Sequence, residues 1–195
     1  MRRSGGRRRG WARCVAVSAL VAGAALAGTA SADAQAPAGD PVKRGEYLVN
    51  FGGCHDCHTP LKMGPRGPEP DVDRALSGHP AALKMPAAPK VQEPWGWAGA
   101  STMTAFAGPW GVSYAINLTS DDTGVGKWTE EMFVQAMRTG KHTGVGRPIL
   151  PPMPWQNVAR LSDGDLKAVF AYLKSVKPVK NVVPPPQLAA APPGR

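Results

Sequence analysis

Residues 52–60 read GGCHDCHTP, and this stretch decides how the rest of the chain is interpreted. It holds two of the three cysteines and two of the four histidines in a chain of 195 residues. Cys54 and Cys57 are three positions apart, so one helical turn can present both thiols on the same side, and His58 follows at once. One close pair of cysteines cannot form a disulfide framework, so these residues indicate a local chemical site.

The pattern Cys-x-x-Cys-His is typical of covalent haem attachment. The two thiols add to the vinyl groups on one edge of the porphyrin, and an imidazole at the next position can then reach the iron. The sequence therefore predicts one haem c, bound covalently through Cys54 and Cys57, with His58 as an axial iron ligand. The other ring nitrogen of His58 is expected to donate to a backbone carbonyl that fixes the ring.

Two other uses of the motif are weaker. A zinc site needs a second pair of Cys or His ligands, and His79 and His142 lie far apart in the sequence with no partner nearby. A thioredoxin-like redox pair should follow a strand in a βαβ pattern, which the sequence does not show.

The second axial ligand is predicted to be Met153, in the stretch ILPPMPW at 149–155. Pro151, Pro152 and Pro154 each fix φ and prevent helix formation, so they can hold a thioether in place. His142 is the main competitor, while Met132 and Met137 fit the apolar face of a helix. Three methionines in the long loop region are further candidates: Met63, Met85 and Met103. A Met/His pair closes the coordination of the iron and suits electron transfer.

Three helices are expected around this site. The first begins at Asp40 and Pro41 and ends at Gly52, the second follows a cap at Thr129, and the last follows a cap at Ser162. A glycine inside the first helix, Gly45, costs about 1 kcal/mol relative to alanine, which indicates a close approach by another helix.

The intervening region, 59–116, is different, with nine prolines and seven glycines. Its second half also carries five aromatic residues, and a disordered linker seldom has so much aromatic area. We expect an ordered wrap of loops. The aromatic residues are Trp95, Trp97, Phe106, Trp110 and Tyr114.

The first 34 residues are predicted to be a secretory signal peptide, because a basic stretch and a short apolar run precede small residues at A-x-A spacing. Cleavage is expected near Ala32 or Ala34; a retained membrane anchor is the alternative. We therefore expect a periplasmic protein with no stable membrane span after cleavage. A domain over 35–180 is followed by a Pro/Ala-rich tail, 181–195, which is expected to be extended.

The formal charge of +9 belongs mostly to the signal peptide. Six of the 23 basic residues lie in the first 13 positions, while all 14 acidic residues follow residue 32, so the net charge after residue 32 is only +3. This balance is ordinary for a soluble surface and predicts no nucleic-acid partner.

Four stretches together resemble the bacterial class I c-type cytochromes, and more closely the single-haem exported kind related to cytochrome c subunits of periplasmic dehydrogenases. They occur in that family's order: RGEYLVNFGGCHDCHTP, NLTSDDTGVGKWTEEMFVQAMRTGKH, GRPILPPMPW and LSDGDLKAVFAYLKSVKPV. The resemblance implies an all-α class I cytochrome c fold, with a long loop-rich insertion between the haem motif and the later helices. It also implies that the first and last helices cross, with Gly45 facing the region of Tyr172 and Leu173.

The same resemblance implies functional assignments. Met153 matches the family's ligand methionine, and Asn117, Trp128 and Arg147 match positions near the haem. The implied function is a periplasmic electron carrier that is not itself an enzyme, with a dehydrogenase as donor and an oxidase or another cytochrome as acceptor. The alternatives are a cytochrome subunit within a periplasmic dehydrogenase complex, or a haem enzyme or gas sensor if the sixth iron position is open.

Overall fold

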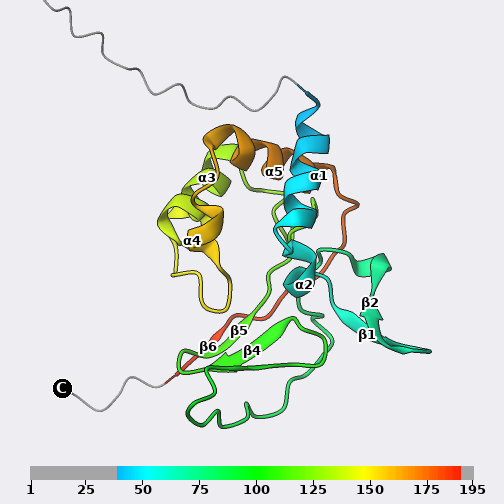
Figure 1. The fold of residues 1–195 in the computed structure, drawn as a ribbon, viewed down its shortest axis with the longest axis vertical. Helices are drawn as coiled ribbons and strands as arrows, with labels where there is room; N and C mark the ends of the chain where they lie inside the picture. Colours follow the sequence, from blue (N-terminus) through cyan, green and yellow to red (C-terminus); the bar gives the residue numbers. More distant parts are fainter. Residues whose placement is uncertain (1–38, 190–195) are drawn as a thin grey trace, which may run out of the picture. The chain divides into compact units, whose positions relative to one another are not determined.

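The computed structural model describes residues 39–189, so the predicted signal peptide and the last six residues of the predicted tail lie outside the described range. Within it, the helical elements are α1 (Pro41–Phe51), α2 (Cys54–His58), η1 (Val72–Arg74), α3 (Glu130–Thr139), η2 (His142–Gly144), α4 (Trp155–Val158) and α5 (Asp163–Ser175). Here η marks a short 3₁₀ turn. Figure 1 shows α1 crossing α5, and α3 also contacts α5.

The three longer helices begin where their capping residues predict. Asp40 accepts a hydrogen bond from the amide of Val42 through its side chain, at 2.9 Å. Thr129 accepts in the same way from the amide of Met132, and Ser162 from that of Asp165. Each cap satisfies one of the unpaired amides of a first helical turn, which fixes the start of the helix.

The helices share one apolar core. Phe133 of α3 stacks on Phe170 of α5, with ring centroids 5.4 Å apart. Val49 of α1 and Leu173 of α5 are also almost fully buried in this cluster. Because each helix contributes only one apolar face, the three must pack together for any of them to be stable.

Gly45 is the point of closest approach between α1 and α5. A Cβ atom added there would lie 2.0 Å from the carbonyl oxygen of Ala168 and 2.7 Å from Cβ of Tyr172. The predicted helix contact near Tyr172 is therefore confirmed, and a side chain of any size would force the two helices apart.

Two antiparallel sheets accompany the helices. One is the hairpin of β1 (Leu61–Gly64) and β2 (Gly67–Pro70). The other has four strands in the order β3 (Ala98–Gly99), β4 (Ala105–Gly108), β5 (Gly111–Tyr114) and β6 (Gln187–Leu188).

The prediction of an all-α fold is therefore wrong, because the described chain combines helices with two antiparallel sheets. Part of the expected wrap of loops, at 61–70 and 98–114, is strand and hairpin instead. The strands have at most four residues, interrupted by proline and glycine, so no alternating pattern is long enough to identify them in the sequence.

The described part of the segment after residue 180, predicted to be an extended tail too rich in proline and alanine to pack, makes contacts with the domain. β6 pairs with β5, and a Cβ atom at Gly111 would lie only 2.0 Å from the carbonyl oxygen of Gln187. The side-chain amide of Asn181 donates to the carbonyls of Ser77 and His79, at 2.7 and 2.9 Å. Extended backbone can therefore pack here because its polar groups find partners in the domain.

Candidate functional site

The short helix α2 presents the Cys-x-x-Cys-His motif. Its N-cap, Gly53, has φ +66°, and a Cβ atom there would lie 2.8 Å from a carboxylate oxygen of Asp56. Glycine is therefore needed to turn the chain from α1 into α2. Cys54 and Cys57 are both free thiols, one helical turn apart. The turn therefore has the helical spacing of the two thiols that the sequence predicted.

His58 is held by a single directional hydrogen bond. Its side chain is 7% exposed, and its Nδ1 lies 2.8 Å from the carbonyl oxygen of Ile116. A carbonyl only accepts, so Nδ1 carries the proton and the lone pair of Nε2 is left to bind a metal. Burial lowers the pKa of His58 below its ordinary value, which favours this neutral form. The predicted hydrogen bond from His58 to a backbone carbonyl is confirmed.

The two thiols do not have the character of a redox-active pair. Burial raises the pKa of Cys54 to about 11 and also raises that of Cys57. Reactive cysteines of the thioredoxin type have lowered pKa values, because the thiolate is the nucleophile. The environment of these thiols therefore does not favour disulfide exchange.

His55, between the two cysteines, has a structural contact of its own. Its Nδ1 lies 2.8 Å from the hydroxyl oxygen of Thr59, which also accepts a hydrogen bond from the amide of Leu76 at 2.9 Å. These contacts fasten the end of α2 to the segment that follows it.

A cavity of about 320 Å³ lies next to the residue that holds His58. Ile116 lines it, as do the three residues that the family resemblance implies: Asn117, Trp128 and Arg147. The rest of the wall comes from His142 and from the segment 182–186, among other residues. Sequence reasoning did not find that the chain after residue 180 contributes to this wall, because a proline-rich segment carries no sign of where it packs.

Asn117 organises the cavity wall and has no spare hydrogen-bonding capacity. Its amide nitrogen donates to the hydroxyl of Thr123 and to the carbonyl of Val179. Its amide oxygen accepts from the backbone and the hydroxyl of Thr119. All four positions of the amide are filled, so this side chain shapes the cavity and does not reach a ligand.

Trp128, His142 and Arg147 stand together on the same wall. The ring of His142 meets the Trp128 indole edge-on, with centroids 5.0 Å apart, and burial lowers the pKa of His142. The Arg147 guanidinium donates to the carbonyl of Pro148 through one nitrogen only. A guanidinium has five N–H donors, so Arg147 can still bind a carboxylate.

Met153 lies in a loop that is fastened through its carbonyl groups. The hydroxyl of Ser113 donates to the carbonyl of Pro151 at 2.6 Å, and the amide of Trp155 donates to that of Met153 at 2.9 Å. Met153 is partly buried against the helical core, as is Cys54. The methionine and the cysteine turn therefore border the same core.

The other methionines have different surroundings. Met63 is 77% exposed. Of the two methionines predicted on the apolar face of a helix, Met137 is buried in the helical core, but Met132 is 41% exposed, so that prediction is wrong for Met132. Met103 lies beside Gly99, at the edge of the sheet.

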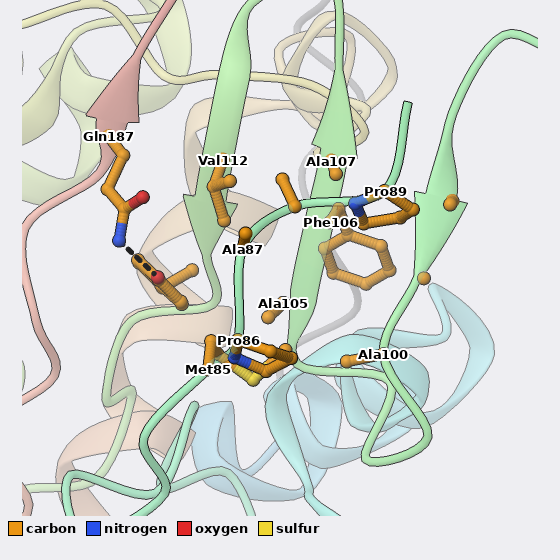
Figure 2. A pocket seen from close by; sticks show the side chains of 14 residues that line it. Met85, Pro86, Ala87, Pro89, Ala100, Ala105, Phe106, Ala107, Val112 and Gln187 are labelled. Carbon is orange, nitrogen blue, oxygen red and sulfur yellow. Dashed lines mark hydrogen bonds between the residues drawn. The ribbon is translucent and has the colours of Figure 1, made fainter. Parts of the chain in front are cut away.

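Met85 lines a separate small cavity of about 80 Å³ on one face of the four-stranded sheet. Figure 2 shows its mainly apolar lining, in which Gln187 donates to the hydroxyl of Tyr114 at 3.1 Å. This cavity is distinct from the one that Trp128 and Arg147 line.

His79 is fully buried and lies outside the motif in the sequence. It is hydrogen-bonded to the hydroxyl of Thr104, and its ring is tilted by 44° relative to that of Tyr114, with centroids 4.8 Å apart. Among residues 39–189, no three side chains of His, Cys, Asp or Glu gather closely enough to hold a metal ion. Nor does any helix of this range have the length and apolar character to cross a membrane.

The residues present fit a covalently attached haem. Two free thiols stand one turn apart, and the neighbouring imidazole has its proton placed on Nδ1, so its Nε2 can bind iron. Sequence reasoning found these three residues but missed Ile116 and Ser113. A backbone carbonyl leaves no trace in the residue type, and a lone serine in a short strand has no distinguishing pattern.

Comparison with known proteins agrees with this chemistry. No model of a known protein family matches the chain. The chain is 31% identical to the cytochrome c subunit of the quinone-dependent alcohol dehydrogenase of Gluconobacter oxydans. The match extends over 140 residues, which are 71% of this chain and 22% of the relative. The chain is 32% identical over 140 residues to the gluconate 2-dehydrogenase cytochrome c subunit of Pantoea cypripedii, covering 71% and 24%.

A third relative is the fructose dehydrogenase cytochrome subunit of Gluconobacter japonicus, which is 30% identical over 149 residues, covering 75% of this chain and 24% of the relative. The chain thus spans about a quarter of the length of these curated relatives. Over most of its own length, the chain is a homologue of the cytochrome c subunits of bacterial alcohol, gluconate and fructose dehydrogenases.

Proposed function

We propose that this chain is a periplasmic electron-transfer protein that carries one covalently attached haem c. The observation that supports this most directly is the α2 turn, where Cys54, Cys57 and His58 stand together and Ile116 fixes the imidazole at 2.8 Å. The homology to cytochrome c subunits supports the same assignment.

Each residue of the turn has a defined part in this function. Cys54 and Cys57 would hold the porphyrin edge through thioether bonds, and His58 would bind the iron through Nε2. When bound, the haem supplies an iron that changes between the ferrous and ferric states. Because His58 is buried and its ring is hydrogen-bonded to Ile116, its position would change little with the charge of the iron, which would lower the reorganisation that electron transfer requires.

We propose that Met153 would be the second residue to bind the iron. Its loop contains three prolines and is tied to strand β5 through Ser113, so the thioether is held in place. A thioether ligand raises the reduction potential and closes the coordination. His142 is the competing ligand, and its ring is packed edge-on against Trp128 beside Arg147.

The cavity lined by Trp128 and Arg147 is proposed to receive the carboxylate side of the haem. The guanidinium of Arg147 has unused donors and can offset the negative charge of a propionate. Asn117, which the family resemblance also placed near the haem, would act by shaping this wall.

Export and partners are part of the proposal. A signal peptide over residues 1–34 would be removed near Ala32 or Ala34. A dehydrogenase would donate electrons, and an oxidase or another cytochrome would accept them. The names of the relatives favour a dehydrogenase partner, so a cytochrome subunit within such a complex is the second candidate function. Co-purification of the native protein distinguishes a free carrier from a permanent subunit.

The test is expression of the full chain in a host with c-type maturation machinery. The purified protein should be heavier than its processed polypeptide by one haem and should show, when oxidised, the weak long-wavelength absorption band of methionine ligation. Met153→Ala should remove that band, lower the reduction potential and open the iron to carbon monoxide.

The matched variant is His142→Ala, which removes the competing ligand and should keep the band. If instead His142→Ala changes the spectrum and Met153→Ala does not, Met153 is not the ligand. A colourless protein of bare polypeptide mass refutes the function as a whole.

A further inference from the structure

Strand β5 and the two residues after it contact both of the segments that carry the proposed iron ligands. The carbonyl of Ile116, just beyond the strand, accepts from His58 at 2.8 Å. The hydroxyl of Ser113, within the strand, donates to the carbonyl of Pro151 at 2.6 Å, two residues before Met153. We propose that Ser113 is a positioning residue for Met153. The four-stranded sheet thereby fixes the segment 149–155, called the methionine loop below, relative to His58. This inference rests on the proposed function.

The methionine loop needs fastening from outside because of its composition. Pro151, Pro152 and Pro154 have no backbone N–H, so the segment around Met153 has few donors for a hydrogen-bonding ladder of its own. Its carbonyls are the groups that remain. The hydrogen bond from Ser113 ties the first half of the loop to a different part of the fold, while the amide of Trp155 ties the second half from within the loop.

The alternation of strand β5 directs Ser113 toward the loop. Val112 and Tyr114 line the small cavity on one face of the sheet (Figure 2 labels Val112). Because neighbouring residues of a strand point to opposite faces, Ser113 points away from that cavity. Ser113 is itself buried, at 7% exposure, so water does not compete for its hydroxyl.

A second donor strengthens the contact. The indole N–H of Trp110 donates to the oxygen of Ser113 at 3.3 Å, and the hydroxyl then donates to Pro151. Hydrogen bonds in such a chain polarise one another, so each makes the next stronger. The pair of residues thus forms a short relay from the β4–β5 turn to the methionine loop.

The central experiment compares the holoprotein of wild type and Ser113→Ala. Loss of the hydrogen bond to the Pro151 carbonyl should release the methionine more often, raising the rate of carbon monoxide binding to the ferrous protein about fivefold. It should also weaken the long-wavelength methionine band and lower the reduction potential. Ser113→Thr keeps the hydroxyl and should restore all three readouts.

Gln187→Ala is the matched control. It removes the hydrogen bond from Gln187 to Tyr114 and so loosens the same sheet, but it does not contact the methionine loop. It should leave the band, the potential and the carbon monoxide rate as in the wild type. Trp110→Phe keeps an aromatic ring and removes the indole donor to Ser113. It should change the same three readouts in the same direction as Ser113→Ala, by a smaller amount. This variant provides the test if Ser113→Ala does not fold.

The outcomes separate this inference from the function on which it rests. If the wild type shows the methionine band and both Ser113→Ala and Trp110→Phe match it, Ser113 does not position Met153, while the function stands. If Gln187→Ala has the same effect as Ser113→Ala, the sheet acts through stability alone and the inference is also refuted. A wild-type protein without the methionine band refutes the ligand assignment, and with it the role of Ser113.

Discussion

Replacing Gly45 by alanine tests the helix crossing on which the fold depends. The new Cβ atom would lie 2.0 Å from the carbonyl oxygen of Ala168, one ångström inside the 3.0 Å below which real Cβ contacts are essentially never found. The nearest atoms are backbone, so α1 and α5 must separate. Overpacking of this kind costs about 1–3 kcal/mol, and here the rigid neighbour favours the upper end. Alanine returns about 1 kcal/mol of helix propensity.

The expected net loss is therefore about 2 kcal/mol, which lowers the thermal midpoint by roughly 5 °C for a domain of this size. The measurement is thermal and urea unfolding followed by far-ultraviolet circular dichroism. Gly164→Ala in α5 is the matched control, since the nearest atom to its new Cβ is the hydroxyl of Ser162 at 3.8 Å. The control should be as stable as the wild type or more so. If Gly45→Ala is equally stable, α1 and α5 do not pack as described.

Two further predictions concern the buried polar groups around the insertion. Burial lowers the pKa of His79 in the folded protein. As the pH drops below ~6.5, His79 therefore binds a proton more readily in the unfolded chain than in the folded one, and the free energy of unfolding should fall. His79→Gln should reduce the loss of unfolding free energy between pH 7 and pH 5, measured by urea unfolding. An equal loss in the variant and the wild type would contradict this. Asn181→Ala leaves the carbonyls of Ser77 and His79 without their donor, at a cost of about 1 kcal/mol for each hydrogen bond. Residues 182–189 should then exchange amide hydrogens faster and the chain should be cut more readily after Lys180, whereas unchanged protection would show that Asn181 does not anchor this segment.

Local sequence patterns correctly predicted the three longer helices and the single helical turn that carries Cys54, Cys57 and His58. A cap such as Ser162 acts on an amide three residues away, and Cys54, Cys57 and His58 occupy a single turn, so the relevant residues lie next to one another in the sequence. Gly45 was informative for a similar reason, because a glycine inside a helix has a known cost that close packing explains.

The strands could not be predicted in the same way. β4 and β5 have four residues each, and β6 has two, so their hydrophobic periods are too short to separate from loop. Their stability comes from partners that are distant in the chain, such as the pairing of Gly111 with Leu188. The error in fold class follows from this, since proline and glycine content describes a segment but not what it pairs with.

The region 59–116 is better described as part of the candidate site than as a surface addition. The amide of Gly78 donates to the backbone carbonyl of His58 at the end of α2, and the ring of His58 donates to the carbonyl of Ile116 where the region ends. Within the region, the amide of Leu76 donates to the hydroxyl of Thr59, which follows His58 directly. His58 is therefore held by this region through both its backbone and its ring. The β1–β2 hairpin is mostly exposed, whereas the segments around Gly78 and Ile116 are constrained by their hydrogen bonds to His58.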